Sequence, residues 1–334
     1  MQLAAIVILN YNGVEMLRRF LPSVIGFSAF PIIIADNGSA DQSVDFLQRE
    51  FPQIRLIQLE SNFGFTGGYN RALEILKGDF ENYILLNSDV QVEQDWDVKL
   101  IRFLDENREA AAVQPKILSF PHPGFFDYAG AGGGFLDSLG YPYCRGRIFN
   151  TIEKDSNQYD DIVKVHWASG ACMAIRSQIF HTAGGFDERF FAHMEEIDLC
   201  WRIRKMGYSI HYLGTSKVWH VGGGTLDRTS PWKTFLNFRN NLLMLHNNER
   251  PSRFALIYLI RLGLDFLAAS VFLVRGSFED AKAVFRGHIE FHKMKSKFPD
   301  ITSAEYMPFK EKGMFRRSIL WDYYIRGKKN FSEL

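Results

Sequence analysis

Short apolar runs alternate with longer amphipathic stretches along residues 1–100 of the chain. The apolar runs, at residues 3–9, 32–35, 54–58 and 83–86, are continuous and rich in β-branched side chains, as expected of strands that are buried on both faces. The stretches between them predict helices. Strands that alternate with helices indicate a mainly parallel α/β sheet, in which ligands bind at the carboxyl ends of the strands. The first run has no basic segment before it and predicts a strand rather than a signal peptide.

The pattern is less regular at residues 113–165, where segments rich in Gly and Pro mark loops, and we predict no regular elements there. Order returns at residues 162–175. A helix is predicted over residues 195–206, where it ends before a glycine, and two further strands are predicted at residues 209–213 and 217–220.

Beyond residue 225 the pattern predicts long helices. Between Arg253 and Arg275 the only other charged residues are Arg261 and Asp265, and at about 100° per residue the four charges form one narrow stripe on an otherwise apolar helix. Two charges in mid-segment argue against a membrane-spanning helix. A helix that lies in the membrane interface is one interpretation, and a helix that packs on its own domain is the other.

Composition and charge indicate a binding partner of the C-terminal region. The chain has 334 residues, of which 46% are hydrophobic and 23% are charged, as in ordinary globular proteins with a large core. The net charge is +1, but residues 281–334 hold 12 Lys and Arg against 6 Asp and Glu. This basic tail favours an anionic membrane surface, since no nucleic-acid-binding module is recognisable. Cys144, Cys172 and Cys200 form no CxxC pair, which is typical of reduced thiols in a cytosolic protein.

Polar side chains follow three of the predicted strands. Asn10 ends the first, Asp36 ends the second, and Asn87 and Asp89 follow the strand at residues 83–86. Asp36 can accept hydrogen bonds from a nucleoside, although an Asx turn with a helix cap explains the same residues. Asp89 can bind Mg²⁺ or Mn²⁺, which needs few protein ligands when substrate phosphates and water complete its shell. A simple strand-ending turn is the alternative there.

A glycine-rich turn lies between a strand and a helix. It runs from Asn62 to Asn70 and contains Gly64, Gly67 and Gly68. Glycines at such a turn let backbone N–H groups approach a diphosphate, and the N-terminus of the following helix favours negative charge.

Glu195, Glu196 and Asp198 lie at the start of one predicted helix. Carboxylates there compensate the helix dipole, and Asp198 can also pair with a basic residue one turn later. Transfer of a group to a hydroxyl, however, needs a base near that hydroxyl that is ionised at neutral pH, and a helix N-terminus favours an ionised carboxylate. His220 closes a strand, and a lone histidine is usually structural. Next to Asp89 it can supplement a carboxylate at a Mg²⁺ or Mn²⁺ site.

These segments, taken in order over about residues 3–225, resemble the motif series of the inverting family 2 glycosyltransferases, most closely their rhamnosyltransferase-like and galactofuranosyltransferase-like branch. The resemblance implies a GT-A fold, a nucleotide-diphosphate sugar donor, a divalent metal and inversion at the anomeric carbon. Asp89 matches the metal-binding acid of the DxD motif, with Asn87 at its first acidic position. Glu196 matches the catalytic base, with Glu195 and Asp198 as alternatives. The motifs that match the donor side contain Asn10, Asp36, Asn62, Gly64, Gly67, Gly68, Asn70 and Asn87.

The expected architecture is a GT-A α/β domain at residues 1–225, with a nucleotide-sugar half at 1–100 and an acceptor half at 101–225. A C-terminal helical, membrane-associating region follows at 226–334. The expected activity is sugar transfer to a hydroxyl of a saccharide or lipid-linked saccharide, in polysaccharide assembly on the cytoplasmic face of the plasma (inner) membrane.

Two other protein classes make different demands on the sequence. A non-catalytic nucleotide-sugar or glycan-binding relative is the alternative, but it should have lost Asp89 or the acidic pair Glu195 and Glu196, and all three are present. A Rossmann dehydrogenase would need GxGxxG after the first strand, and this chain lacks it. The sequence leaves a homo-oligomer open.

Overall fold

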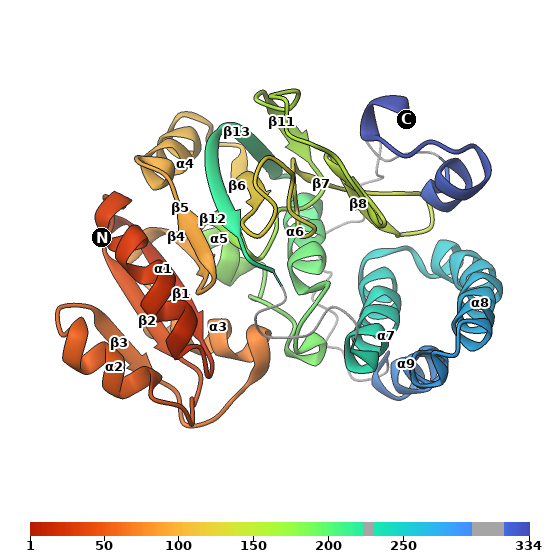
Figure 1. Cartoon of the computed structure of the whole chain (residues 1–334), viewed down its shortest axis with the longest axis horizontal. Helices are drawn as coiled ribbons and strands as arrows, with labels where there is room; N and C mark the ends of the chain where they lie inside the picture. The colour runs from red at the N-terminus through yellow and green to blue at the C-terminus, as the bar shows by residue number, and fades with distance from the viewer. Residues whose placement is uncertain (223–229, 296–316) are drawn as a thin grey trace.

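In the computed structural model, which describes residues 1–222, 230–295 and 317–334, a nine-stranded mixed sheet runs through the middle of the protein (Figure 1). The strand order is β11-β13-β6-β12-β4-β1-β2-β3, and β5 pairs with β13 beside this path. The strands are β1 (Gln2–Asn10), β2 (Ile32–Asp36), β3 (Arg55–Gln58), β4 (Phe80–Asn87), β5 (Val90–Val92), β6 (Ala110–Ser119), β11 (Ile162–Val165), β12 (Cys172–Arg176) and β13 (Ser209–His220).

The part of the sheet made by β4, β1, β2 and β3 is parallel. Helices cover it on both sides, which explains why the apolar runs in the sequence are continuous rather than alternating. One face packs against α3 (Gly64–Ile75), α5 (Ser177–Thr182) and α6 (Glu195–Lys205), and the other packs against α1 (Val14–Phe27), α2 (Ser43–Glu50) and α4 (Trp96–Glu106). The predicted α/β fold with a mainly parallel sheet is confirmed.

Two predictions about the middle of the chain were wrong. Residues 113–165 are not free of regular structure, because they contain most of β6 and a second, four-stranded sheet made of β7 (Gly134–Leu136), β8 (Pro142–Cys144), β9 (Arg147–Ile148) and β10 (Thr151–Ile152). These strands are too short to leave a period in the sequence. The two strands predicted at 209–213 and 217–220 are one strand, β13, whose register shifts between Leu213 and Lys217.

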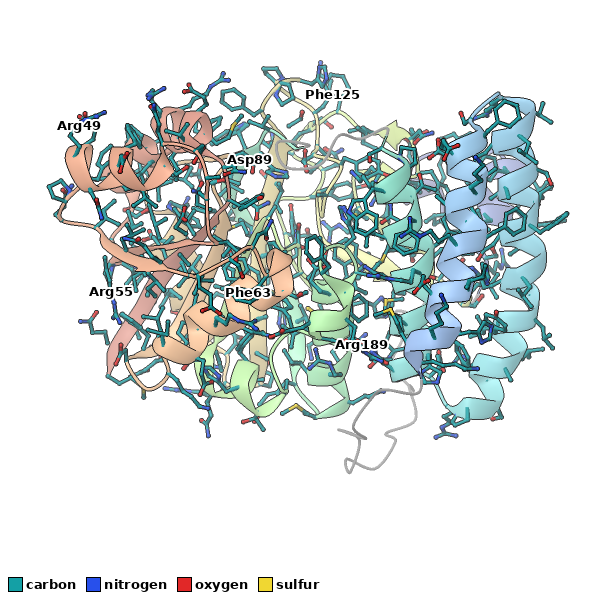
Figure 2. The ribbon with its side chains drawn as sticks, turned by 90° about the horizontal axis from the view of Figure 1, so that it is seen from below. Arg49, Arg55, Phe63, Asp89, Phe125 and Arg189 are labelled. Atoms are coloured by element: carbon teal, nitrogen blue, oxygen red, sulfur yellow. The ribbon has the colours of Figure 1, made fainter. Side chains whose placement is uncertain are left out.

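Three long helices, α7 (Pro231–Asn248), α8 (Pro251–Val274) and α9 (Phe278–Met294), lie at the opposite end of the molecule from α2 and β3 (Figure 1). Figure 2 shows them side by side along one edge of the molecule. The short helix η3 (Trp321–Ile325) then packs its Tyr323 against Tyr143 of β8 and Ile148 of β9. Part of the basic tail, at residues 296–316, lies outside the described residues.

The charged stripe of α8 faces inward. Arg261 and Asp265 are 2% and 1% exposed, and Arg261 Nε lies 3.3 Å from Asp265 Oδ1. The Arg261 guanidinium also donates to Asn241 of α7 and lies 4.0 Å from the Tyr141 ring centroid. His288 of α9 reaches the other carboxylate oxygen of Asp265 at 3.1 Å. The middle of the stripe thus packs on the protein's own domain, as one of the two interpretations of the sequence expected.

Because Arg261 and Asp265 face inward, the apolar side of the middle of α8 faces outward. Leu256, Leu259, Phe266, Leu267 and Val274 are each more than half exposed. By length and composition α8 is the one helix among the described residues that qualifies as a membrane span, with a mean hydropathy of 2.0 over its best 18 residues. Length and composition alone do not separate a spanning helix from a helix on the protein surface.

The inward stripe makes a prediction about stability. Arg261→Ala leaves Asp265 buried without its cation, so the free energy of unfolding should fall by about 3–5 kcal/mol. Arg253→Ala is the control, because Arg253 lies on the same helix, is 42% exposed in its side chain and pairs with Glu249 at 3.4 Å. It should change stability by less than about 1 kcal/mol. Urea denaturation measures both, and equal losses would contradict the inward placement of the stripe.

Candidate active site

A cavity of about 540 Å³ lies at the carboxyl ends of β1, β2 and β4, between the sheet and the start of α6. In Figure 2, Asp89 lies between the N-terminal α/β elements and the C-terminal helices. The cavity is lined by seven of the predicted residues, Asn62, Gly64, Asn87, Asp89, Glu195, Glu196 and His220. A separate hollow at the amino ends of the same strands, lined by Gln2, Ile32 and Phe80, holds none of these residues.

The glycine-rich turn is held by a residue that sequence reasoning missed. Asn37, directly after β2, donates from Nδ2 to Asn62 Oδ1 at 3.1 Å and to the Gly64 carbonyl at 2.9 Å. Its Oδ1 accepts from the Phe63 amide at 3.1 Å. Gly64 has a φ of +71°, and a Cβ there would lie 2.5 Å from the Phe191 ring. The turn therefore requires glycine at position 64, and Asn37 itself lines the cavity.

Asp36 and Asn10 lie beneath the cavity and do not line it. Asn10 Nδ2 donates to Asp36 Oδ2 at 2.9 Å, while the amide and hydroxyl of Ser39 donate to Asp36 at 2.9 and 2.7 Å. These bonds are those of the Asx turn that the sequence allowed as an alternative. Asn10 Oδ1 is buried and has no hydrogen-bond partner among the described residues.

Gly67, Gly68 and Asn70 lie inside α3, away from the cavity. A Cβ at Gly68 would lie 2.8 Å from Leu9, and one at Gly67 would lie 2.8 Å from Phe63. Asn70 bonds both backbone groups of Phe186, at 2.8 and 2.9 Å. In the structure these glycines allow α3 to pack closely on its neighbours.

The second group of cavity residues is brought together by pairing between β5 and β13, which aligns Val90 with His220. His220 Nε2 lies 3.2 Å from Asp89 Oδ1, and His220 Nδ1 lies 3.1 Å from Asp127 Oδ2. Asn87 Nδ2 lies 3.4 Å from His220 Nε2. Asp127, which follows β6 and is 1% exposed, was missed because nothing in its local sequence marks it.

The carboxylates of Asp89 and Asp127 determine the charge of the His220 imidazole. Burial alone would lower the pKa of His220, but its hydrogen bonds to Asp127 and Asp89 raise the pKa to about 10. Burial likewise favours the protonated form of Asp89, yet the hydrogen bond and charge of His220 keep the pKa of Asp89 below its ordinary value. His220 is therefore an imidazolium that bridges two carboxylates.

The geometry of Asp89 and His220 fits a divalent cation that displaces the proton on Nε2. Asp89 Oδ1 and His220 Nε2, which lie 3.2 Å apart at the same cavity, would hold the ion together. Asp127 would keep the other ring nitrogen oriented. Among the described residues no group of three or more His, Cys, Asp or Glu side chains is arranged to hold a metal ion, so substrate and water would supply the remaining ligands.

Glu195 and Glu196 enter the cavity from the first turn of α6. The Oε2 atoms of both are buried and have no hydrogen-bond partner among the described residues. Burial, and then the charge of Glu196, raises the pKa of Glu195 well above its ordinary value. Burial raises the pKa of Glu196 to about 7, although backbone N–H groups at the helix start act in the opposite direction. Near pH 7 the pair therefore holds Glu195 protonated and Glu196 close to its pKa, where its ionised form can take up a proton.

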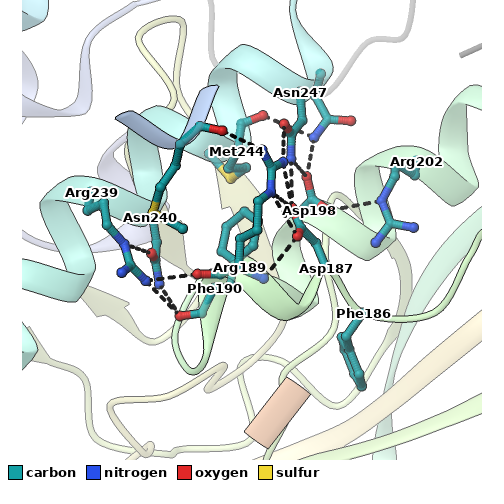
Figure 3. A network of polar contacts seen from close by, with 12 residues as sticks. Phe186, Asp187, Arg189, Phe190, Asp198, Arg202, Arg239, Asn240, Met244 and Asn247 are labelled. Atoms are coloured by element: carbon teal, nitrogen blue, oxygen red, sulfur yellow. Dashed lines mark hydrogen bonds and ion pairs between the residues drawn. The ribbon is translucent and has the colours of Figure 1, made fainter. Parts of the chain in front are cut away.

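Asp198 faces away from the cavity. Its Oδ2 accepts from Arg202 Nε at 2.8 Å, and its Oδ1 accepts from Asn248 at 2.7 Å and from Asn247 at 3.1 Å. Figure 3 shows this network between α6 and α7. The pair one turn apart that the sequence allowed is present, and it is buried rather than on the surface.

Further lining residues come from segments that gave no sequence signal. His193 precedes α6, Lys233 lies on the first turn of α7, and Tyr128 follows Asp127. Burial, and then the charge of Lys233, lowers the pKa of His193 to about 4, so His193 is neutral. Because Lys233 lines the cavity, the C-terminal helices contribute directly to it.

Comparisons with known proteins agree with this geometry. Residues 5–183, more than half of the chain, match the family described as Glycosyl transferase family 2, and the chain belongs to this family. The chain is 28% identical over 233 residues to an N-acetylglucosaminyl-diphospho-decaprenol L-rhamnosyltransferase of Mycobacterium tuberculosis (strain CDC 1551 / Oshkosh), which covers 64% of this chain and 75% of that protein. It is 24% identical over 245 residues to the low-salt glycan biosynthesis hexosyltransferase Agl10 of Haloferax volcanii, which covers 72% of this chain and 74% of that one.

Among solved structures, GalNAc-T7 with UDP, GalNAc and Mn²⁺ superposes with a TM-score of 0.56 at 16% identity. The match covers 73% of this chain and 48% of that chain, and at this identity it shows the fold alone. The family, the GT-A fold and the glycosyltransferase activity that the sequence predicted are confirmed.

Proposed function

We propose that this family 2 glycosyltransferase moves a sugar, with inversion, from a nucleotide-diphosphate sugar to a hydroxyl of a lipid-linked saccharide during polysaccharide assembly. One observation carries the proposal. Asp89, after β4, and Glu196, at the start of α6, are the two carboxylates that such a transfer requires, and both line the same cavity. The M. tuberculosis relative is named for an acceptor of this chemical class. A non-catalytic relative would have no need to keep both carboxylates at one cavity.

The donor would bind on the sheet side of the cavity. Asn37, Asn62 and Gly64 line this side of the cavity, and the hydrogen bonds of Asn37 fix the turn that leads into α3. Asp89 and His220 would hold Mg²⁺ or Mn²⁺, which when bound stabilises the negative charge that develops on the departing diphosphate. GalNAc-T7, which shares this fold, was solved with UDP and Mn²⁺.

Glu196 would act as the base on the acceptor side. Its carboxylate takes the proton of the acceptor hydroxyl while that oxygen bonds to the anomeric carbon. The bond from the anomeric carbon to the diphosphate oxygen breaks on the opposite face and leaves its electron pair on the nucleoside diphosphate. Glu195, protonated beside it, adds no second negative charge that would repel the departing diphosphate.

The metal proposal predicts loss of Mn²⁺ binding. Asp89→Ala and His220→Ala should each abolish binding and transfer, because each removes one of the only two side chains proposed as metal ligands among the described residues. Asp127→Asn should weaken Mn²⁺ binding by about 10–100-fold through the orientation of His220. Calorimetric titration of Mn²⁺ in the presence of nucleoside diphosphate measures these effects. Asp45→Asn, an exposed carboxylate on α2, is the control, and full activity of Asp89→Ala in EDTA would refute the proposal.

The base proposal predicts a pH dependence. Because burial raises the pKa of Glu196 to about 7, kcat should fall as the pH drops through about 7 and the base becomes protonated. Glu196→Gln cannot accept the proton, so its kcat should fall by about 10²–10⁴-fold with donor affinity little changed. Steady-state transfer assays test both. A larger loss in Glu195→Gln or Asp198→Asn, with Glu196→Gln near wild type, would move the base to that residue.

We also propose a membrane surface as the partner of the outward side of the C-terminal helices. This apolar face is formed by Leu256, Leu259, Phe266, Leu267 and Val274 of α8 with Phe278, Phe285 and Ile289 of α9. The rings of Phe266 and Phe285 lie 6.1 Å apart between the two helices. Exposed apolar surface of this kind marks interaction sites, and basic side chains such as Arg253 and Lys282 lie on the same helices. Apolar burial combined with attraction to anionic headgroups gives stable peripheral anchoring. A lipid-linked acceptor lies at such a surface.

A cytoplasmic location fits both the proposed donor and the cysteines of the protein. Nucleotide sugars are cytoplasmic metabolites, and Cys144, Cys172 and Cys200 are all buried free thiols, as is typical of a reducing compartment.

Flotation with liposomes tests the membrane proposal. The protein should float with vesicles that contain anionic lipid, and high salt should release part of it. Leu259→Glu and Phe266→Glu should abolish flotation without unfolding the protein, since the two side chains are 68% and 62% exposed. Ile75→Glu, an exposed apolar residue of α3 at 53%, is the matched control. A protein that stays unbound at low salt and forms a dimer that Leu259→Glu dissociates would assign the apolar face to a second copy instead.

A further inference from the structure

We propose that α7 holds, through Asn240 and Arg239, the backbone turn that places the general base, so that Asn240 is a positioning residue of the transfer reaction. The inference rests on the proposed role of Glu196. It makes the first helix of the C-terminal region part of the catalytic apparatus, although this helix lies outside the part of the chain that matches the family.

The turn directly before Glu195 is strained. Phe191, His193 and Met194 have φ values of +63°, +70° and +72°, a region that side chains with a Cβ rarely adopt. Such conformations persist only where the surrounding structure imposes them, and they gather at functional sites. Glu195 and Glu196 follow immediately, so the path of this turn sets where their carboxylates enter the cavity.

Asn240 meets the turn with its amide group. Its Nδ2 lies 3.0 Å from the Phe190 carbonyl and 2.8 Å from each of the Ala192 and His193 carbonyls. Its Oδ1 accepts from Arg239 Nε at 2.8 Å, which fixes the orientation of the amide. Asn240 is 0% exposed, so no water replaces these contacts. Figure 3 shows Asn240 and Arg239 directed at the backbone near Phe190.

Arg239 contacts the same turn and the residue before it. Its guanidinium donates to the Arg189 carbonyl at 3.0 Å and to the Phe190 carbonyl at 3.1 Å. On the other side of the turn, the Phe191 carbonyl accepts from the Phe65 amide of α3 at 2.8 Å. The turn is thus clamped between α3, which carries the donor-side loop, and α7.

A second contact aligns α7 with α6. Asn247 and Asn248 donate to Asp198 on α6, and they lie seven and eight residues after Asn240. Two turns of helix separate these positions, so all three lie on one face of α7. Arg189 connects the two contacts. Its carbonyl accepts from Arg239, and its guanidinium donates to Asn247 at 3.0 Å and pairs with Asp187 at 2.8 Å (Figure 3). The face of α7 therefore holds both the turn before α6 and the first turn of α6.

The neighbouring residue provides a matched control. Asn241 is 3% exposed and lies on the same helix, but its Nδ2 donates to the Gly140 carbonyl at 2.8 Å and its Oδ1 accepts from Arg261. Asn241→Ala should therefore lose a comparable amount of stability without touching the turn. A purely structural role of Asn240 would give the two variants the same phenotype.

The experiment compares Asn240→Ala with Asn241→Ala in the full chain. A displacement of the base by about 1 Å can lower the rate about 10²-fold, so Asn240→Ala should lower kcat by about 10–10²-fold while the affinity for nucleoside diphosphate with Mn²⁺ stays within about twofold. Backbone amides of residues 190–197 should exchange hydrogen faster in Asn240→Ala than in wild type. Asn241→Ala should keep kcat within about twofold, with unchanged exchange in this segment.

Asn240→Ser provides a second variant should Asn240→Ala fold poorly, because its hydroxyl can still donate to one carbonyl and an intermediate kcat is expected. Equal losses of kcat in the Asn240 and Asn241 variants, or unchanged exchange at residues 190–197 in Asn240→Ala, would overturn the inference. Hydrogen exchange needs no substrate. If wild type fails to transfer to any lipid-linked acceptor, the proposed function fails, while the exchange contrast still decides whether Asn240 holds the turn.

Discussion

The pairing of buried charges is the constraint on which the rest of this structure depends. A buried ion without a partner is strongly destabilising, and the chain meets this requirement with His220 between two carboxylates and with Arg261 on Asp265. Glu195 and Glu196 are the exception, since their buried Oε2 atoms have no partner among the described residues. Burial raises the pKa values of both carboxyl groups, so this pair accommodates burial by protonation instead of by an ion pair. Unpaired buried carboxylates that face a cavity are what a catalytic site requires and what a purely structural helix start avoids.

The position of the cavity follows from strand direction. Parallel strands bring their carboxyl ends to one edge, and the sequence places polar residues there. This edge alone supplies Asn37 and Asp89. The antiparallel pairing of β5 with the end of β13 adds His220 from 131 residues further along the chain, and the loop after β6 adds Asp127. The site is therefore built where the parallel and antiparallel parts of the sheet meet, and neither part contains it alone.

The sequence predicted what depends on local pattern and missed what depends on long-range contact. The parallel strands and the helix that begins at Glu195 left clear periods. Asp89 and Glu196 were chosen as candidates because they stand at element ends, and both line the cavity. Nothing local distinguishes Asp127 or Asn240, whose roles come from partners about 50 to 90 residues away. The charged stripe of α8 was found by its period, but the same period fits a stripe that faces water or one that faces protein. Only the contacts of Arg261 show which side is covered.

The C-terminal helices pack their polar faces on the rest of the protein, and α8 exposes its apolar side. On α7 the face that carries Asn240 and Asn248 packs on the elements around Glu196, and on α8 the polar face packs inward on Tyr141 and Asn241. Because the two charges in the middle of α8, Arg261 and Asp265, are used against the protein, the surface left to the outside of this part of the helix is apolar. A helix that used its charges in solvent would leave no such surface. The inward ion pair of α8 and its exposed apolar side are thus two consequences of one packing arrangement, and α7 connects that arrangement to the turn before the acidic pair.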